Sequence, residues 1–148
     1  MITCAFENDG KDSLRHVVVD VLLIDGNKIL LVKRTGKLLE SGKWALPGGF
    51  LARDETCEQG AMREVKEETG YEIQIIKLLR VVDNPDRPKE DRQNVSFVYI
   101  AKPLKKDGDS DNEVSEAKWF DLDKLPPVEE IAFDHYDNIN IYLESIDR

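Results

Sequence analysis

The segment from Thr56 to Thr69 constrains the fold more than any other part of the chain, because it carries the signals for both ends of a helix. Thr56 followed by Gln59 three residues later is a capping-box pattern, which satisfies free N–H groups at a helix N-terminus. Gly70 stands where a residue in the left-handed conformation commonly ends a helix. The sequence therefore predicts one strong central helix in this segment.

Three glutamates give this helix an unusual distribution of charge. Glu64, Glu67 and Glu68 are spaced i, i+3, i+4, which places all three carboxylates on one face. Like charges at this spacing destabilise a helix, and its last turn favours cations. We expect Arg63 and Lys66 to point to the other side, so a bound divalent cation is the natural compensation. Oxygen ligands with few histidines nearby indicate Mg²⁺, with Mn²⁺ as the alternative.

Length and composition narrow the class of protein. With 148 residues, 41% hydrophobic and 34% charged, the chain is predicted to form a single domain over residues 1–148. The formal net charge of −9 argues against a nucleic-acid polymer as partner, although a metal ion can bridge an acidic protein to a small phosphorylated ligand. The apolar stretches are too short to cross a bilayer, and residues 1–14 lack a signal-peptide pattern, so a cytoplasmic location is expected.

Strand patterns dominate the rest of the chain. Strands are predicted over residues 15–24, 28–34, 71–82, 94–101 and 114–120, with a short extended segment at 44–46. Polar, proline-bearing or glycine-bearing loops are predicted at residues 35–43, 83–93 and 104–112. A second helix is expected over roughly residues 133–145. Two helices covering opposite faces of a mixed sheet give an α/β/α sandwich, which is an α/β (α+β) fold class.

Residues 49–71 resemble the signature of the Nudix hydrolase family without a gap. The family pattern is a glycine, five residues, a glutamate, seven residues, and then Arg-Glu-apolar-any-Glu-Glu-any-Gly-apolar. The matching residues are Gly49, Glu55, Arg63, Glu64, Val65, Glu67, Glu68, Gly70 and Tyr71. The approach at residues 44–50 and the exit strand at 116–120 are also similar to the family. The resemblance implies the same α/β/α sandwich.

The family chemistry that this resemblance implies is metal-assisted attack of water on a diphosphate linkage. The implied Mg²⁺ ligands are Glu64, Glu67, Glu68 and the carbonyl of Gly49. Glu64 and Glu67 would also serve catalysis. Arg63 would brace a glutamate of the signature, with Glu55 as the candidate, and so keep the ligands oriented.

The general base has several candidates. By resemblance it is either a glutamate of the signature or a glutamate on the loop before the exit strand. Glu113 and Glu116 both qualify by position, and Glu113 is favoured because it lies at the loop edge. The alternative for each is an ordinary surface carboxylate.

Segments outside the signature resemble the ADP-ribose pyrophosphatase branch of the family. They are residues 83–88 followed by 95–99, and residues 131–135 at the opening of the last helix. Arg87 and Arg92 are the candidates for contacting phosphate or ribose, and Arg34 is a weaker one. His135 is expected to be a helix-start residue with no ligand role.

The leading hypothesis is hydrolysis of ADP-ribose, or a related nucleotide sugar, to AMP and a sugar phosphate. The first alternative is a MutT-type pyrophosphohydrolase that removes damaged nucleoside triphosphates. The second is a sensing module that binds ADP-ribose without cutting it, which ranks low because the signature is intact. A small nucleotide is the expected partner, with no membrane partner, and the family resemblance is compatible with a homodimer.

Overall fold

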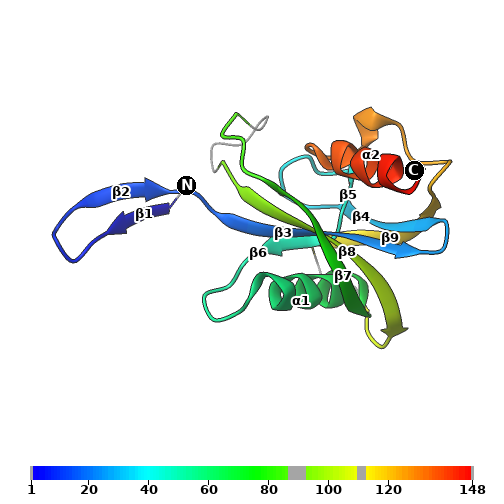
Figure 1. Ribbon diagram of the computed structural model, residues 1–148, viewed down its shortest axis with the longest axis horizontal. Helices are drawn as coiled ribbons and strands as arrows, with labels where there is room; N and C mark the ends of the chain where they lie inside the picture. The colour runs from blue at the N-terminus through cyan, green and yellow to red at the C-terminus, as the bar shows by residue number, and fades with distance from the viewer. Residues whose placement is uncertain (1, 87–92, 110–112, 148) are drawn as a thin grey trace.

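A mixed β-sheet lies between two helices in the computed structural model, which describes residues 2–86, 93–109 and 113–147 (Figure 1). The sheet strands are β3 (Val17–Asp25), β4 (Lys28–Arg34), β5 (Trp44–Ala45), β6 (Gly48–Phe50), β7 (Tyr71–Val82), β8 (Val95–Lys106) and β9 (Val114–Asp121). The helices are α1 (Cys57–Thr69) and α2 (His135–Ile146), preceded in the second case by a 3₁₀ turn, η1 (Val128–Glu130).

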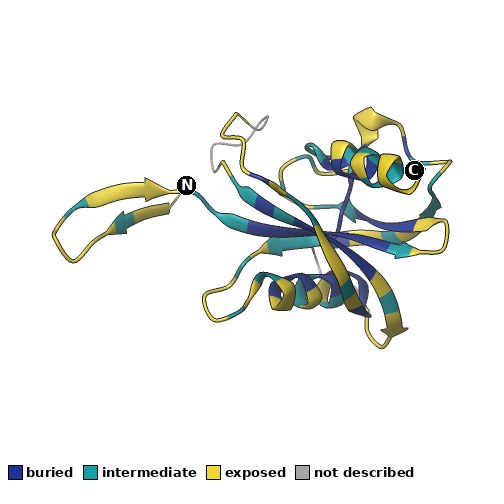
Figure 2. Cartoon of the chain, viewed as in Figure 1, coloured by how far each residue is buried: buried dark blue, intermediate teal, exposed yellow. Residues whose placement is uncertain are grey.

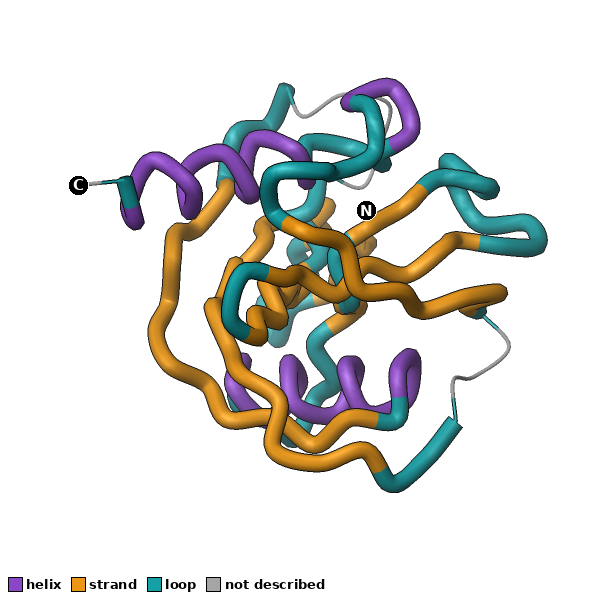
Figure 3. The backbone as a smooth tube through the Cα atoms, turned by 90° about the vertical axis from the view of Figure 1, so that its right-hand side faces the viewer, coloured by secondary structure: helices purple, strands orange, loops and turns teal. Residues whose placement is uncertain are grey.

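The sheet is mixed because it contains both parallel and antiparallel strand pairs. The central path runs β5-β4-β3-β8-β7, with β6 paired to β3 and β9 paired to β4. β3 and β8 are parallel, whereas the other pairs are antiparallel. The two helices lie on opposite sides of the sheet in both views of the chain (Figures 1 and 3). The predicted α/β/α sandwich is therefore confirmed.

β3 supplies both faces of the core because its side chains alternate between the two helices. Val21 packs in one apolar cluster with Ala61 and Val65 of α1. Leu22 packs in the other cluster with Ile139 of α2. Burial on both faces explains why this strand is a nearly continuous apolar run rather than an alternating pattern.

The central helix has the ends that the sequence predicts. The Thr56 side chain accepts a hydrogen bond from the Gln59 N–H at 3.2 Å, and the Gln59 side chain accepts from the Thr56 N–H at 2.8 Å. Gly70 ends the helix with φ of +74°. Both ends are fixed by contacts between residues only a few positions apart, which is why the sequence sufficed to place them.

After residue 14 the structure has a strand at each predicted position, but the prediction was wrong at two places. β8 continues through Lys106, so the loop predicted at residues 104–112 begins later. Its polar end stays extended because Tyr71 and Glu72 of β7 pair with Lys106 and Lys105. β6 was not predicted as a strand, because its two glycines have low strand propensity and only pairing with β3 holds it extended.

A second, two-stranded sheet was also not predicted. β1 (Ile2–Ala5) and β2 (Lys11–Leu14) form an antiparallel hairpin that projects away from the main sheet (Figure 1). Its residues are almost all exposed (Figure 2). A hairpin with no buried face lacks the apolar alternation by which a strand is recognised in a sequence.

Neither helix in the described part of the chain is long and apolar enough to span a membrane.

Gly70 provides a test of the helix end. A Cβ atom there would lie 2.0 Å from the carbonyl oxygen of Gly108, and the positive φ is itself unfavourable for alanine. Gly26 has φ of +59° with nothing within 4 Å of its Cβ position, so it isolates the backbone cost. We expect Gly70→Ala to lower the free energy of unfolding by at least ~1 kcal/mol more than Gly26→Ala. Urea denaturation measures both, and equal losses would contradict the close packing at Gly70.

Candidate active site

The two glycines of β6 bring the backbone against the carboxylate helix. Residues 48–50 pair with residues 18–20 of β3, which places β6 beside the centre of the sheet. A Cβ atom on Gly49 would lie 2.6 Å from the carboxylate carbon of Glu64. A Cβ atom on Gly48 would lie 2.1 Å from the Val19 carbonyl oxygen. Glycine at both positions therefore allows α1 and β3 to approach this strand closely.

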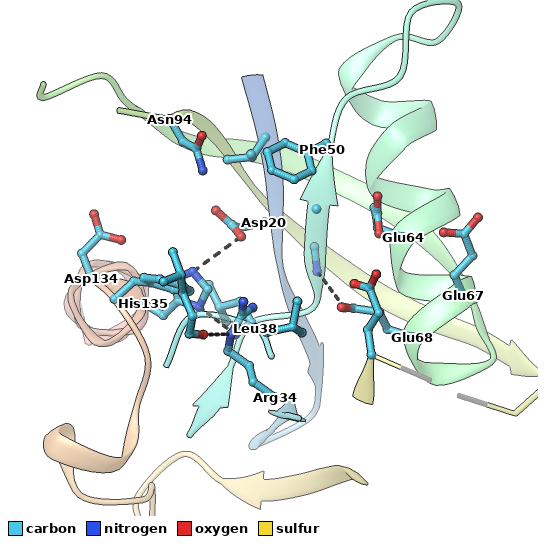
Figure 4. A pocket seen from close by; sticks show the side chains of 17 residues that line it. Asp20, Arg34, Leu38, Phe50, Glu64, Glu67, Glu68, Asn94, Asp134 and His135 are labelled. Atoms are coloured by element: carbon cyan, nitrogen blue, oxygen red, sulfur yellow. Dashed lines mark hydrogen bonds and ion pairs between the residues drawn. The ribbon is translucent and has the colours of Figure 1, made fainter. Parts of the chain in front are cut away.

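Glu68 is held by the same strand. The Gly48 N–H donates a hydrogen bond to Glu68 Oε2 at 2.9 Å (Figure 4). Glu68 is one of the few charged residues that the fold buries. Because a buried polar group needs a hydrogen-bond partner, this contact stabilises the carboxylate and fixes its direction.

Arg63 corrects the expectation that no basic side chain lies on the acidic face. Its Nη1 donates to Glu64 Oε1 at 2.8 Å and to Glu67 Oε2 at 3.0 Å. Arg63 and Glu67 are four residues apart and hence neighbours on the helix surface, and the long side chain also reaches the adjacent Glu64. Lys66 does point elsewhere, to Glu72 and Asp107.

Arg63 is also joined to Glu55, as the sequence suggested. Arg63 Nη2 lies 2.6 Å from Glu55 Oε1, and Nε lies 3.0 Å from Oε2. Nη2 also donates to the Phe50 carbonyl at 3.0 Å. One guanidinium group therefore ties together the loop before α1, strand β6 and two glutamates of α1.

These contacts move the pKa values of the acidic groups in opposite directions. The hydrogen bonds from Arg63, with a further one from the Ala52 N–H, lower the pKa of Glu55 to about 2. Burial raises the pKa of Glu64 above its ordinary value, although the hydrogen bond from Arg63 opposes that rise. The neighbouring Glu67 and Glu113 add to the rise through charge repulsion. A cation beside Glu64 would offset this rise in its pKa.

The donor set suits a hard divalent cation. Glu64, Glu67 and Glu68 all line one pocket, and each offers carboxylate oxygens, which Mg²⁺ and Mn²⁺ prefer. Among the described residues, no three His, Cys, Asp or Glu side chains are gathered as a closed metal-binding cluster. Arg63 engages two of the three glutamate carboxylates, and the Gly48 N–H engages the third. Binding a cation would exchange the Arg63 contacts for metal contacts.

The pocket has a volume of about 290 Å³ and joins the carboxylate helix to a second wall. That wall is formed by residues of β3, the end of β4, the β4–β5 loop, the segment before α2 and the first residue of α2: Asp20, Arg34, Leu38, Leu39, Phe133, Asp134 and His135. Figure 4 shows the three glutamates on one side of β6, and Asp20, Asp134 and His135 on the other. The pocket therefore has an acidic end and a mixed polar and apolar end.

Of the two loop and strand candidates for the general base, one lines the pocket and the other does not. Glu113 lines it, at the start of the approach to β9. Glu116 lies within β9, opposite Lys33, and does not belong to the lining. The role of Glu113 as general base stays a prediction.

Of the three arginines predicted to bind substrate, the structure describes Arg34. Arg34 lines the pocket, its Nε donates to the Leu39 carbonyl at 2.8 Å, and its guanidinium carbon lies 4.9 Å from the centre of the Phe133 ring. Arg87 and Arg92 lie outside the described residues.

Sequence reasoning missed Asp20 and gave His135 no role. Asp20 is a charged residue within the apolar run of β3, and a buried acid in such a run is itself a signal of a polar contact. His135 Nε2 lies 3.5 Å from Asp20 Oδ1, an approach between residues far apart in the sequence. Phe133, in the segment 131–135, was given no role either, although its φ of +55° is uncommon for an aromatic residue.

Comparisons with known proteins agree with this fold and site. A family model described as the NUDIX domain matches residues 14–139. An ADP-ribose pyrophosphatase of Methanocaldococcus jannaschii is 39% identical over 127 residues, which cover 86% of this chain and 72% of the relative.

Solved structures agree as well. The crystal structure of a NUDIX hydrolase from Nitrosomonas europaea matches with a TM-score of 0.79 and 29% identity, covering 97% of this chain and 85% of that one. A bifunctional NMN adenylyltransferase/ADP ribose pyrophosphatase from Francisella tularensis, complexed with AMP and a Mn ion, matches with a TM-score of 0.70 and 27% identity. That match covers 90% of this chain and 42% of the other. With its carboxylate helix, glycine strand and sandwich fold, this chain belongs to the Nudix family of pyrophosphohydrolases.

Proposed function

We propose that this enzyme hydrolyses ADP-ribose, or a related nucleotide sugar, to AMP and a sugar phosphate. The observation that carries the proposal is the pocket, which joins three carboxylates to a wall with polar and aromatic groups. A substrate with a diphosphate between two bulkier groups matches such a pocket. The similarity to an ADP-ribose pyrophosphatase over 86% of this chain supports this choice among nucleoside diphosphate compounds.

The acidic end of the pocket is the proposed metal site. Nudix hydrolases in general depend on a divalent metal ion, and we propose Mg²⁺ here, with Mn²⁺ as a substitute. Its ligands would be Glu64, Glu67, Glu68 and the carbonyl of Gly49. When bound, such an ion neutralises diphosphate oxygens and lowers the pKa of a water molecule. Gly48 would keep Glu68 directed into the site through its N–H.

Arg63 and Glu55 have a supporting role in this proposal. Because Arg63 binds Glu55 through two of its nitrogens, the guanidinium stays anchored when Glu64 and Glu67 turn toward a cation. The anchor also holds the Phe50 carbonyl at the end of β6. The pair would thereby keep the strand and the helix in register during turnover.

The opposite wall is proposed to bind the rest of the substrate. Arg34 is fixed by Leu39 and lies over the Phe133 ring, so its charge faces the pocket from a defined position. Arg87 and Arg92 remain candidates for contacting phosphate or ribose. The cytoplasmic location, the lack of a nucleic-acid partner and the homodimer also remain predictions.

Product analysis tests the substrate. Incubated with Mg²⁺ and ADP-ribose, the protein should release AMP and ribose phosphate, which ion-exchange chromatography resolves. Glu67→Gln should lower this turnover by ~10²-fold or more, because it removes a proposed metal ligand. Release of pyrophosphate from nucleoside triphosphates alone would contradict the proposed substrate, and tight ADP-ribose binding without cleavage would contradict catalysis.

Matched substitutions of two glutamates test which residue is the general base. Glu113→Gln should lower kcat by ~10²-fold or more if Glu113 accepts a proton from the attacking water. Glu116→Gln, in the same segment but outside the pocket lining, is the control and should leave kcat within about twofold. Similar losses in both variants, or none in Glu113→Gln, would remove Glu113 from this role.

The Arg63–Glu55 pair predicts a pH-dependent stability. Because the pKa of Glu55 is lowered from 4.5 to about 2, its ionised form stabilises the folded state above pH 4.5. That contribution is lost as the pH falls from 4.5 toward 2. Urea denaturation in EDTA should therefore show Glu55→Gln less stable than the wild type at pH 7, with the gap shrinking across this window.

Asp54→Asn is the control for this measurement, because the pair between Asp54 and Arg53 is largely exposed. It should change the free energy of unfolding by less than ~0.5 kcal/mol throughout. A gap for Glu55→Gln that stays constant with pH would show that charge at this position is not what stabilises the fold.

A further inference from the structure

Asp20 is a buried acid in β3, at the position that pairs with Gly48 of β6. Asp20 is 7% exposed, between Val19 and Val21, which are both 0% exposed. Burying a carboxylate among apolar residues costs free energy unless polar partners offset it. Asp20 has two such partners on the α2 side of the sheet: the Ser96 hydroxyl donates to Oδ2, and the His135 Nε2 lies 3.5 Å from Oδ1 (Figure 4).

His135 connects this acid to the backbone that leads into β6. The side chain belongs to the first residue of α2 and is almost fully buried, and its Nδ1 accepts a hydrogen bond from the Leu46 N–H at 2.9 Å. An imidazole nitrogen that accepts carries no proton, so the proton of the neutral ring is on Nε2. The Nε2–H then faces Asp20, which fixes both the tautomer and the ring orientation.

Leu46 begins the segment that leads into β6, the strand beside α1. Pro47 follows it and accepts a hydrogen bond from the Val21 N–H at 2.9 Å. Gly48 comes next, pairs with Asp20 in the sheet, and donates its N–H to Glu68. One continuous set of contacts therefore runs from α2 through residues 46–48 to a carboxylate of α1 on the other face.

We propose that His135, oriented by Asp20, is a positioning residue for the carboxylates of α1. By holding the Leu46 N–H it fixes the path of β6, and β6 in turn directs Glu68 and the Gly49 carbonyl. A residue that only filled space would not require a buried acid beside it, since an apolar pair of similar volume would pack there without that cost. The inference deepens the proposed function and rests on its metal site.

Two substitutions at His135 test the contacts of its two ring nitrogens separately. In His135→Asn the amide oxygen takes the place of Nδ1 and can still accept from Leu46. In His135→Gln the amide group extends toward Asp20 and leaves no acceptor beside Leu46. We expect His135→Gln to weaken Mn²⁺ binding about 10-fold or more, and His135→Asn to retain affinity within about threefold.

Electron paramagnetic resonance of free Mn²⁺ measures this affinity without substrate or turnover. His16→Asn is the matched control, because His16 is the other histidine of the chain; its ring is tilted against the Phe50 ring, with the ring centroids 5.2 Å apart. It should leave the Mn²⁺ affinity within about twofold. Melting curves in EDTA confirm that each variant is folded under the conditions of the titration.

The Mn²⁺ titrations distinguish a failure of the positioning role of His135 from a failure of the proposed metal site. Equal Mn²⁺ affinity in the wild type and both His135 variants, or equal weakening in both, would overturn the positioning role. If His135→Gln does not fold, Asp20→Leu decides instead, because leucine offers the Nε2–H no acceptor: the inference expects weaker Mn²⁺ binding, and unchanged binding overturns it. A wild-type protein that binds no Mn²⁺ would instead overturn the metal site itself.

Discussion

The crowding of negative charge at the end of α1 is the constraint on which the rest of the site depends. Glu64, Glu67 and Glu68 occupy one helix face, and Glu68 is buried. Arg63 reduces the repulsion by binding two of them while it remains tied to Glu55. The helix thus holds its acidic face through an internal cation, the guanidinium group of Arg63.

The sheet supplies the second half of the site because β3 serves both faces. Its Val21 packs toward α1 and its Leu22 toward α2, so Asp20 lies on the α2 side. The glycines of β6 then allow the backbone between the two helices to contact both Glu64 and β3. Carboxylates on one face and His135 on the other are thereby linked through a single strand.

Much of the fold followed from local patterns. The capping box, Gly70, the buried β3 and the strand at residues 28–34 were predicted correctly, because each depends on neighbours within a few residues or on a long apolar run. The hairpin of β1 and β2 and the polar end of β8 were not. Their extended form depends on pairing with another strand, and their exposed side chains carry no periodic signal.

The sequence by itself determined the spacing of the three glutamates, the ends of their helix and the glycines before it, because these are fixed by covalent order and local hydrogen bonds. Only the tertiary structure decided that Glu113 rather than Glu116 lines the pocket. It also brought Asp20 to His135, across 115 positions of sequence, and Leu46 to His135, across 89. Such approaches depend on how strands and helices pack, and no local pattern records them.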